Sequence, residues 1–231
     1  MPGGEGLLPG RGHRRRRVRQ IPVFPLPGVV LFPGTLLPLH VFEPRYCKMV
    51  EDALAGEGVI GMTMITEQPP SSPLLSEPAV KSCGGAGRII EHEMLEDGRY
   101  NILLEGSYRF RILEEVPSNP YRTMTIEEYP SIPFSSAAVE QAATTATRRL
   151  FEEVQAPLGL APLPSEALST ERLCGELAIR LRWPSEALQV LLETDSLEAR
   201  FDVILGRLVE WKQSADFLAP FRAETIDPNA N

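Results

Sequence analysis

Five prolines between Ile21 and Leu39 constrain the fold of this chain more than any other feature. Each proline removes a backbone donor and holds φ at about −65°, so the stretch cannot be helical; the five are Pro22, Pro25, Pro27, Pro33 and Pro38. The pattern predicts an edge-like strand at 21–24, a turn through Pro33-Gly34 and a second strand at 36–41. Pro44 suits the first position of a helix, and Gly56 follows as a stop. We therefore expect a sheet, with a helix folded against its end.

The residues between Val59 and Tyr129 predict the rest of this sheet. At 59–65, apolar residues occupy both odd and even positions, which indicates a strand buried on both faces. Residues 88–113 indicate a hairpin that turns at Asp97-Gly98. In its second strand, apolar residues occupy the even-numbered positions and are expected to face the core. Arg109 and other polar residues occupy the odd-numbered positions and are expected to face solvent. A strand is also expected at 121–129, and the glycine cluster at 84–87 is expected to be a flexible turn. About six short strands fit a small closed or half-closed barrel.

From Phe134 onward the apolar period changes to that of helices. The first predicted helix carries one inward stripe, made of Val139, Ala143, Ala146, Leu150 and Val154. The string PSEAL occurs at 164–168 and again at 184–188, and both copies predict helix starts. Asp195 to Glu198 resembles a capping box that opens a last helix. We expect four parts: a disordered basic extension at 1–19, a barrel at 20–131, a helical part at 132–219 and a flexible tail at 220–231.

Three segments carry a resemblance to a known family. FPLPGVVLFPGTLLPLHVFEPRY, GRIIEHEMLEDGRYNILLEGSYRFRI and PSEALQVLLETDSLEARFDVILGRLVEW resemble the N-terminal, substrate-binding domain of Lon proteases, which also recurs in cereblon-type proteins. The second segment includes the Gly-x-x-Arg-Phe-x-Ile element that begins at Gly106. The resemblance runs from about Ile21 to about Lys212. It implies an α+β fold, in which a PUA-like β pseudo-barrel is followed by a C-terminal α-helical bundle.

The sequence lacks the motifs that would make it an enzyme of the Lon type. No G-x-x-x-x-G-K-[ST] phosphate loop is present, and no motif signals a serine-lysine dyad. The chain therefore resembles a freestanding substrate-binding domain, without ATPase or peptidase. Three distant cysteines show no metal-ligand spacing, and we expect no cofactor, no metal and a reducing, cytoplasmic location. His40 and His92 are more simply half-buried histidines than catalytic bases.

Charge is distributed unevenly along the chain. Residues 1–19 hold six arginines and one glutamate, although the whole chain has a net charge of −8. The arginine run could contact RNA or an acidic membrane surface, mark an export signal, or form a disordered extension. The prolines that follow it argue against the apolar helix of an export signal and against a membrane-spanning helix. The acidic remainder is a poor match for nucleic acid.

The resemblance, with the missing enzyme motifs, implies a non-catalytic module that binds unfolded or tagged polypeptides in protein quality control, with a separate protease as a candidate partner. The candidate binding residues are Phe32, Pro33, Phe42, Tyr46, Leu74 and Leu75. The alternative is that the aromatic residues simply form the core between barrel and helix. Two rival functions are a PUA-like RNA-binding protein and a hydrolase remnant. Truncating Phe42 separates core from site, because only a core residue is needed for cooperative folding.

Overall fold

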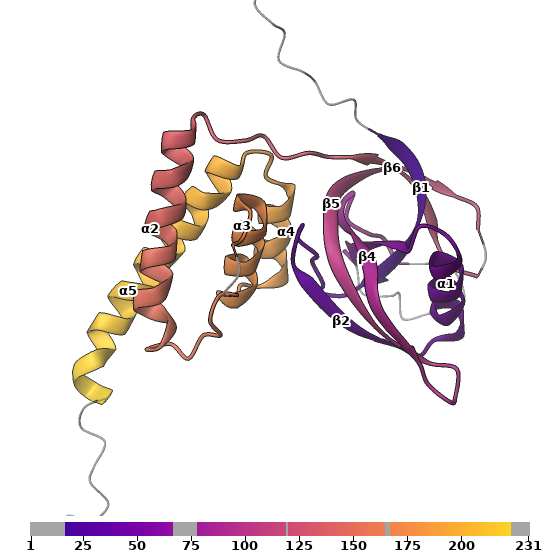
Figure 1. The fold of residues 1–231 in the computed structure, drawn as a ribbon, viewed down its shortest axis with the longest axis horizontal. Helices are drawn as coiled ribbons and strands as arrows, with labels where there is room; N and C mark the ends of the chain where they lie inside the picture. The colour runs from indigo at the N-terminus through magenta and orange to yellow at the C-terminus, as the bar shows by residue number, and fades with distance from the viewer. Residues whose placement is uncertain (1–16, 67–77, 119, 165–166, 223–231) are drawn as a thin grey trace, which may run out of the picture.

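The computed structural model describes residues 17–66, 78–118, 120–164 and 167–222, and it divides into a β-barrel and a group of helices (Figure 1). The strands are β1 (Val18–Leu26), β2 (Leu36–Val41), β3 (Val59–Met64), β4 (Cys83–Met94), β5 (Tyr100–Val116) and β6 (Thr123–Glu128). The helices are α1 (Pro44–Ala55), α2 (Ala137–Gln155), α3 (Thr170–Arg180), α4 (Ser185–Glu193) and α5 (Leu197–Arg222). The barrel thus comes first in the chain, and four of the five helices follow it.

The six strands form one mixed sheet in the order β2-β5-β4-β3-β1-β6. Among the strand pairs of the described residues, β1 and β3 are parallel and the others are antiparallel. The sheet closes because β5 is long enough to pair twice on one side, with β2 through its first half and with β6 through its second half. The resulting barrel leaves β2 as the strand with a single partner among the described residues.

Helix α1 follows β2 as the prolines predict. Pro44 occupies the first turn, and the N–H of Gly56 donates to the carbonyl of Ala53 where the helix ends. The buried face of the helix packs into one of two apolar clusters of the barrel and consists of Tyr46, Met49, Val50 and Ala53. This helix therefore closes one end of the barrel.

Three of the four C-terminal helices have serine caps, and these helices form a separate core. Ser136 and Ser169 accept hydrogen bonds from backbone N–H groups at the starts of α2 and α3, and Ser196 does so at the start of α5. Helices α2 and α5 lie side by side (Figure 1). Phe32, from the proline-rich loop of the barrel, is buried in this helical core, whereas its neighbour Leu31 is buried in the barrel. Adjacent residues of one loop therefore join the two cores.

The predicted helix faces and starts need two corrections. Within the predicted stripe of α2, Val139 is 38% exposed and Ala146 is exposed. The residues of α2 that are buried are Thr147, Phe151 and Val154, so the helix is rotated from the predicted orientation. In the first PSEAL the described residues, Pro164, Ala167 and Leu168, are not helical, and α3 begins only at Thr170; the second PSEAL lies at the start of α4. In both cases, local sequence leaves several helix positions possible and packing selects one.

The glycine cluster at 84–87 is not a flexible turn but the first part of β4, and this prediction was wrong. A Cβ atom on Gly85 would lie 1.9 Å from the carbonyl oxygen of Leu31, and one on Gly106 of β5 would lie 2.0 Å from that of Phe32. The glycines therefore allow the loop that holds Leu31 and Phe32 to lie directly on the barrel wall. Their role is close backbone approach, which sequence spacing does not reveal.

Several strand and helix ends lie near the limits expected for the four parts. Strand β1 begins at Val18 and pairs with β6 from that residue, so Val18 and Arg19 belong to the barrel rather than to the predicted basic extension. The segment that contains Pro130 joins β6, which ends at Glu128, to α2, which begins at Ala137. Helix α5 extends to Arg222, past the predicted start of a tail at residue 220. Residues 1–16 and 223–231 lie outside the described residues.

Candidate functional site

Three of the predicted binding residues lie in the interior. Phe32 and Tyr46 are 1% and 4% exposed, and Pro33 is also buried. Phe32 contributes to the helical core and Tyr46 to the barrel core. The core alternative therefore accounts for the positions of the two aromatic residues, Phe32 and Tyr46. Leu74 and Leu75 lie outside the described residues.

Phe42 has the opposite environment, because its side chain is 62% exposed at the corner between β2 and α1. The His40 ring lies beside it, with ring centroids 6.2 Å apart. His40 is held in place by Asn101, whose Oδ1 is 2.8 Å from Nδ1, and by Arg99, which lies 3.1 Å from Nε2. A fixed ring pair therefore stands on the surface beside the last residues of β2.

The outer side of β2 is an open strand edge within the described part of the chain. The N–H of Gly106 donates to the carbonyl of Thr35 at 2.9 Å. This bond determines which residues of β2 direct their backbone groups toward β5. Because pairing alternates along an antiparallel strand, the backbone groups of Leu36, Pro38 and His40 point away from β5. Pro38 has no N–H to offer, which is typical of an edge strand. Leu36 and His40 keep both a donor and an acceptor on this edge.

A cleft of about 620 Å³ separates the start of β2 from helix α3. Thr35 and Leu36 form one wall, and the other wall comes from α3 and its neighbours; the latter residues are Ala161, Pro164, Arg172, Glu176, Ile179, Arg180 and Arg182. The close approach of the walls begins at Gly34, where a Cβ atom would lie 2.7 Å from the side chain of Arg172. Gly34 has φ of 78°, a left-handed conformation that favours glycine.

The cleft is basic, although the chain as a whole is acidic. Its lining contains three arginines and one glutamate. Glu176 forms an ion pair with Arg180 and lies 3.8 Å from Arg172. Arg182, in contrast, is exposed, forms no ion pair with the described residues, and donates one hydrogen bond from Nη2 to the carbonyl of Gly159 at 3.2 Å. Its backbone φ of 49° is the only positive value found for a non-glycine residue in the described ranges.

Sequence spacing does not reveal this cleft. Leu36 and the arginines of α3 are more than 130 positions apart, and they meet only because the proline-rich loop packs on α3. The strained backbone of Arg182 depends on how α3 turns into α4, and left-handed residues of this kind often occur at functional positions. The one local indication was Pro38, whose place in an apolar strand predicts an edge.

Arg109, predicted to face solvent, is 1% exposed, so that prediction was wrong. The outer face of β5 is covered by the helices at this point. Arg109 Nη1 donates to the carbonyls of Leu192 and Thr194, at 2.6 and 3.2 Å, and Arg200 Nε donates to the same Thr194 carbonyl. Burial, and then the nearby Arg200, lower the pKa of Arg109 to about 10, so it remains charged at neutral pH. The two guanidinium groups join β5 to the end of α4.

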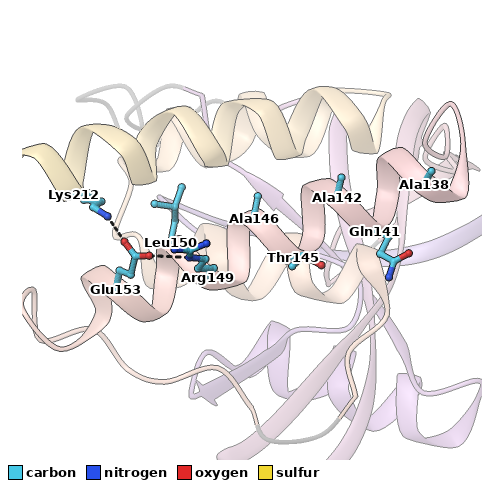
Figure 2. Close-up of a pocket in the computed structure, with 9 residues that line it drawn as sticks. All are labelled: Ala138, Gln141, Ala142, Thr145, Ala146, Arg149, Leu150, Glu153 and Lys212. Carbon is cyan, nitrogen blue, oxygen red and sulfur yellow. Dashed lines mark hydrogen bonds and ion pairs between the residues drawn. The ribbon is translucent and has the colours of Figure 1, made fainter.

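A second hollow, of about 730 Å³, lies along α2 and α5 (Figure 2). Small side chains of α2, namely Ala138, Ala142 and Ala146, line it together with Leu150. Figure 2 shows Glu153 of α2 between Arg149 of the same helix and Lys212 of α5. Glu153 forms ion pairs with both. Of the stripe that sequence periodicity placed in the core, Ala146 and Leu150 line this hollow.

Comparison with known proteins identifies the fold. Residues 20–210 match the family model described as the ATP-dependent protease La (LON) substrate-binding domain. The chain belongs to the Lon substrate-binding domain family. A Lon protease of Anaeromyxobacter dehalogenans is 26% identical over 193 residues, which cover 81% of this chain and 23% of that protein. A Lon protease 2 of Myxococcus xanthus is 25% identical over 205 residues, which cover 87% of this chain and 24% of that protein.

Solved structures of Lon N-terminal domains share the fold of this family member. The Lon N-terminal domain protein from Xanthomonas campestris is 24% identical, with a TM-score of 0.58, over 81% of this chain and 98% of that one. The N-terminal domain of the Mycobacterium avium complex Lon protease is 15% identical, with a TM-score of 0.61, over 84% of this chain and 98% of that one. The predicted family and α+β fold are therefore confirmed. The chain spans about a quarter of the length of the two full Lon proteases compared above.

The Lon substrate-binding domain described here holds no cluster of three or more His, Cys, Asp or Glu side chains placed to bind a metal, as far as its described residues show. Its cysteines are free thiols. Burial raises the pKa of Cys83 to about 11 and that of Cys174 to about 12, so both thiols are protonated at neutral pH and are poor nucleophiles. No helix in the described ranges is both long and apolar enough to cross a membrane.

Proposed function

We propose that this Lon substrate-binding domain recognises unfolded or tagged polypeptides in protein quality control and catalyses no reaction itself. Membership of the family supports binding of protein substrates in general. The observation that carries the finer proposal is the exposed Phe42 beside the open edge of β2. An apolar ring next to unpaired backbone groups suits an extended chain, which offers both apolar side chains and a free backbone. A folded protein offers neither.

The proposal also includes a cytoplasmic location and delivery of bound chains to a protease. Free cysteines support the former, since disulfides are rare in reducing compartments. Fluorescence anisotropy with the full chain tests the binding itself. The probe is reduced, carboxymethylated lactalbumin, which cannot refold, and native lactalbumin is the control. We expect saturable binding of the unfolded probe and no binding of the native protein; equal affinities for both would contradict the proposal.

The non-catalytic part of the proposal has its own test. The pure chain is incubated with ATP and with casein, and phosphate release and casein cleavage are measured. We expect neither activity above a buffer control. ATP turnover or cleavage that persists through successive purification steps would show that the chain is an enzyme.

A further inference from the structure

We propose that the cleft between β2 and α3 binds an extended polypeptide segment that pairs with the open edge of β2 and places an acidic side chain against Arg182. This inference rests on the proposed function and specifies its substrate class: apolar segments that contain acidic residues. Three features of the cleft support it, namely its backbone edge, its charge and its apolar walls.

The backbone edge provides the pairing. Leu36 lines the cleft and, with His40, directs an N–H and a carbonyl away from β5. No backbone hydrogen bond to these outward groups is found from the described residues. A peptide in extended conformation can satisfy them by adding a strand. Pro38 presents a carbonyl but no N–H on this edge. The peptide therefore pairs with both backbone groups only at Leu36 and His40.

The charge of the cleft selects the side chains of the peptide. Glu176 pairs with Arg180, so it does not neutralise the positive charge of Arg182. Arg182 is exposed and makes a single hydrogen bond with the described residues, which leaves donors for a carboxylate. An Arg–carboxylate pair is strong because it is charge-assisted and often bidentate. The same charge disfavours the arginine-rich residues 1–19 of this chain as the occupant.

The walls of the cleft supply apolar contacts on both sides of the edge. Leu36 is 45% exposed and Ile179 is 41% exposed, although both are large apolar side chains. They face the cleft from β2 and α3 respectively. Covering them removes apolar surface from water, which favours a peptide with valine or isoleucine over a polar linker. The combination of apolar walls and an available arginine therefore specifies an acidic, apolar segment.

A labelled twelve-residue peptide of valine, threonine and glutamate provides the probe, with anisotropy as the measurement on the full chain. Two matched peptides carry glutamine for glutamate, or N-methyl groups on alternate backbone nitrogens. The first removes the carboxylates, and the second removes strand pairing and keeps the side chains. We expect each change to weaken binding by about tenfold, in line with the loss of one charge-assisted pair or of the backbone bonds.

Arg182→Gln is the variant that tests the site. We expect it to weaken binding of the glutamate peptide about tenfold and to leave the affinity for the glutamine peptide unchanged, because the lost contact needs a carboxylate. Arg149→Gln on α2 is the matched control, since it removes the same charge from the other hollow, and we expect it to bind like the original chain. Thermal unfolding establishes that both variants fold. Equal affinities of the Arg182→Gln variant and the original chain for the glutamate peptide would overturn the proposal.

The remaining outcomes distinguish failure of this inference from failure of the proposed function on which it rests. One outcome is that the chain binds carboxymethylated lactalbumin while its peptide affinity is the same for all three peptides and is unchanged by Arg182→Gln. In that case polypeptide binding stands and this cleft is not the site. If it binds no unfolded chain at all, the proposed function fails as well. Removal of residues 223–231, which contain Glu224 and Asp227, tests the chain's own end as occupant. A tenfold gain in peptide affinity after that removal would overturn the assignment of the cleft to a substrate.

Discussion

At the scale of single residues, exposure separates side chains that the sequence motif presents together. Phe42 and Tyr46 are four positions apart, yet Phe42 is 62% exposed and Tyr46 is 4% exposed. Tyr46 packs on Phe24 with ring centroids 4.2 Å apart, inside the barrel core. One aromatic residue therefore stabilises the fold, and the other is available to a partner.

Truncation of these two residues should have opposite effects. We expect Tyr46→Ala to lower the free energy of unfolding by about 3 kcal/mol, because it leaves a cavity in the barrel core. Phe42→Ala should change it by less than about 0.5 kcal/mol and weaken binding of carboxymethylated lactalbumin. Urea unfolding and anisotropy measure the two quantities. A Phe42→Ala chain that loses cooperative unfolding would assign Phe42 to the core instead.

Arg109 illustrates how a polar residue becomes part of an interior. We expect Arg109→Ala to lower the free energy of unfolding by about 3 kcal/mol, because the carbonyl of Leu192 loses its donor and a buried volume is left empty. Arg111→Ala, two positions away on the same strand, removes a half-exposed arginine and should cost less than about 1 kcal/mol. Urea unfolding of both variants makes the comparison. Similar losses for the two would show that burial of Arg109 is not the cause.

At the scale of elements, the proline-rich loop holds the barrel and the helices together. Its residues Leu31 and Phe32 enter different cores, and their carbonyls lie against Gly85 and Gly106. The same loop ends at Gly34, which contacts α3, and leads into β2, the open edge. The position of the candidate cleft is therefore a consequence of how this loop packs.

Two glycine substitutions test the close approach of the loop. Gly106→Ala should lower the free energy of unfolding by at least about 2 kcal/mol, because the added methyl meets backbone 2.0 Å away. Gly206→Ala in α5 meets nothing within 4 Å and should instead raise it by up to about 1 kcal/mol through helix propensity. Denaturant midpoints measure both. Equal effects in the two variants would mean that the loop adjusts freely.

At the scale of the whole molecule, two buried thiols near the joint between barrel and helices link stability to alkaline pH. The ordinary pKa of the thiol is 9.0, and burial raises that of Cys83 to about 11 and that of Cys174 to about 12. The unfolded chain therefore loses these protons first as pH rises above 9. Stability is fully present below pH 9 and falls between pH 9 and the raised values.

We expect the free energy of unfolding to fall by about 2–3 kcal/mol between pH 8 and pH 10 as the two thiols ionise in the unfolded chain. Cys83→Ala and Cys174→Ala should each remove part of this slope, although each also lowers stability at pH 8. Urea unfolding across the pH series gives the slopes. A slope unchanged in the double variant would assign the effect to other groups.

The sequence by itself determined the family, the α+β class and most element boundaries. Prolines, the Asp97-Gly98 turn and β alternation act over a few residues, so β2 at 36–41 and α1 from Pro44 were correctly predicted. Only the tertiary structure decided the burial of Arg109, the role of Gly85 and the cleft at Arg182. Each depends on an element from a distant part of the chain, and the position of such an element follows from packing of the whole molecule rather than from local pattern.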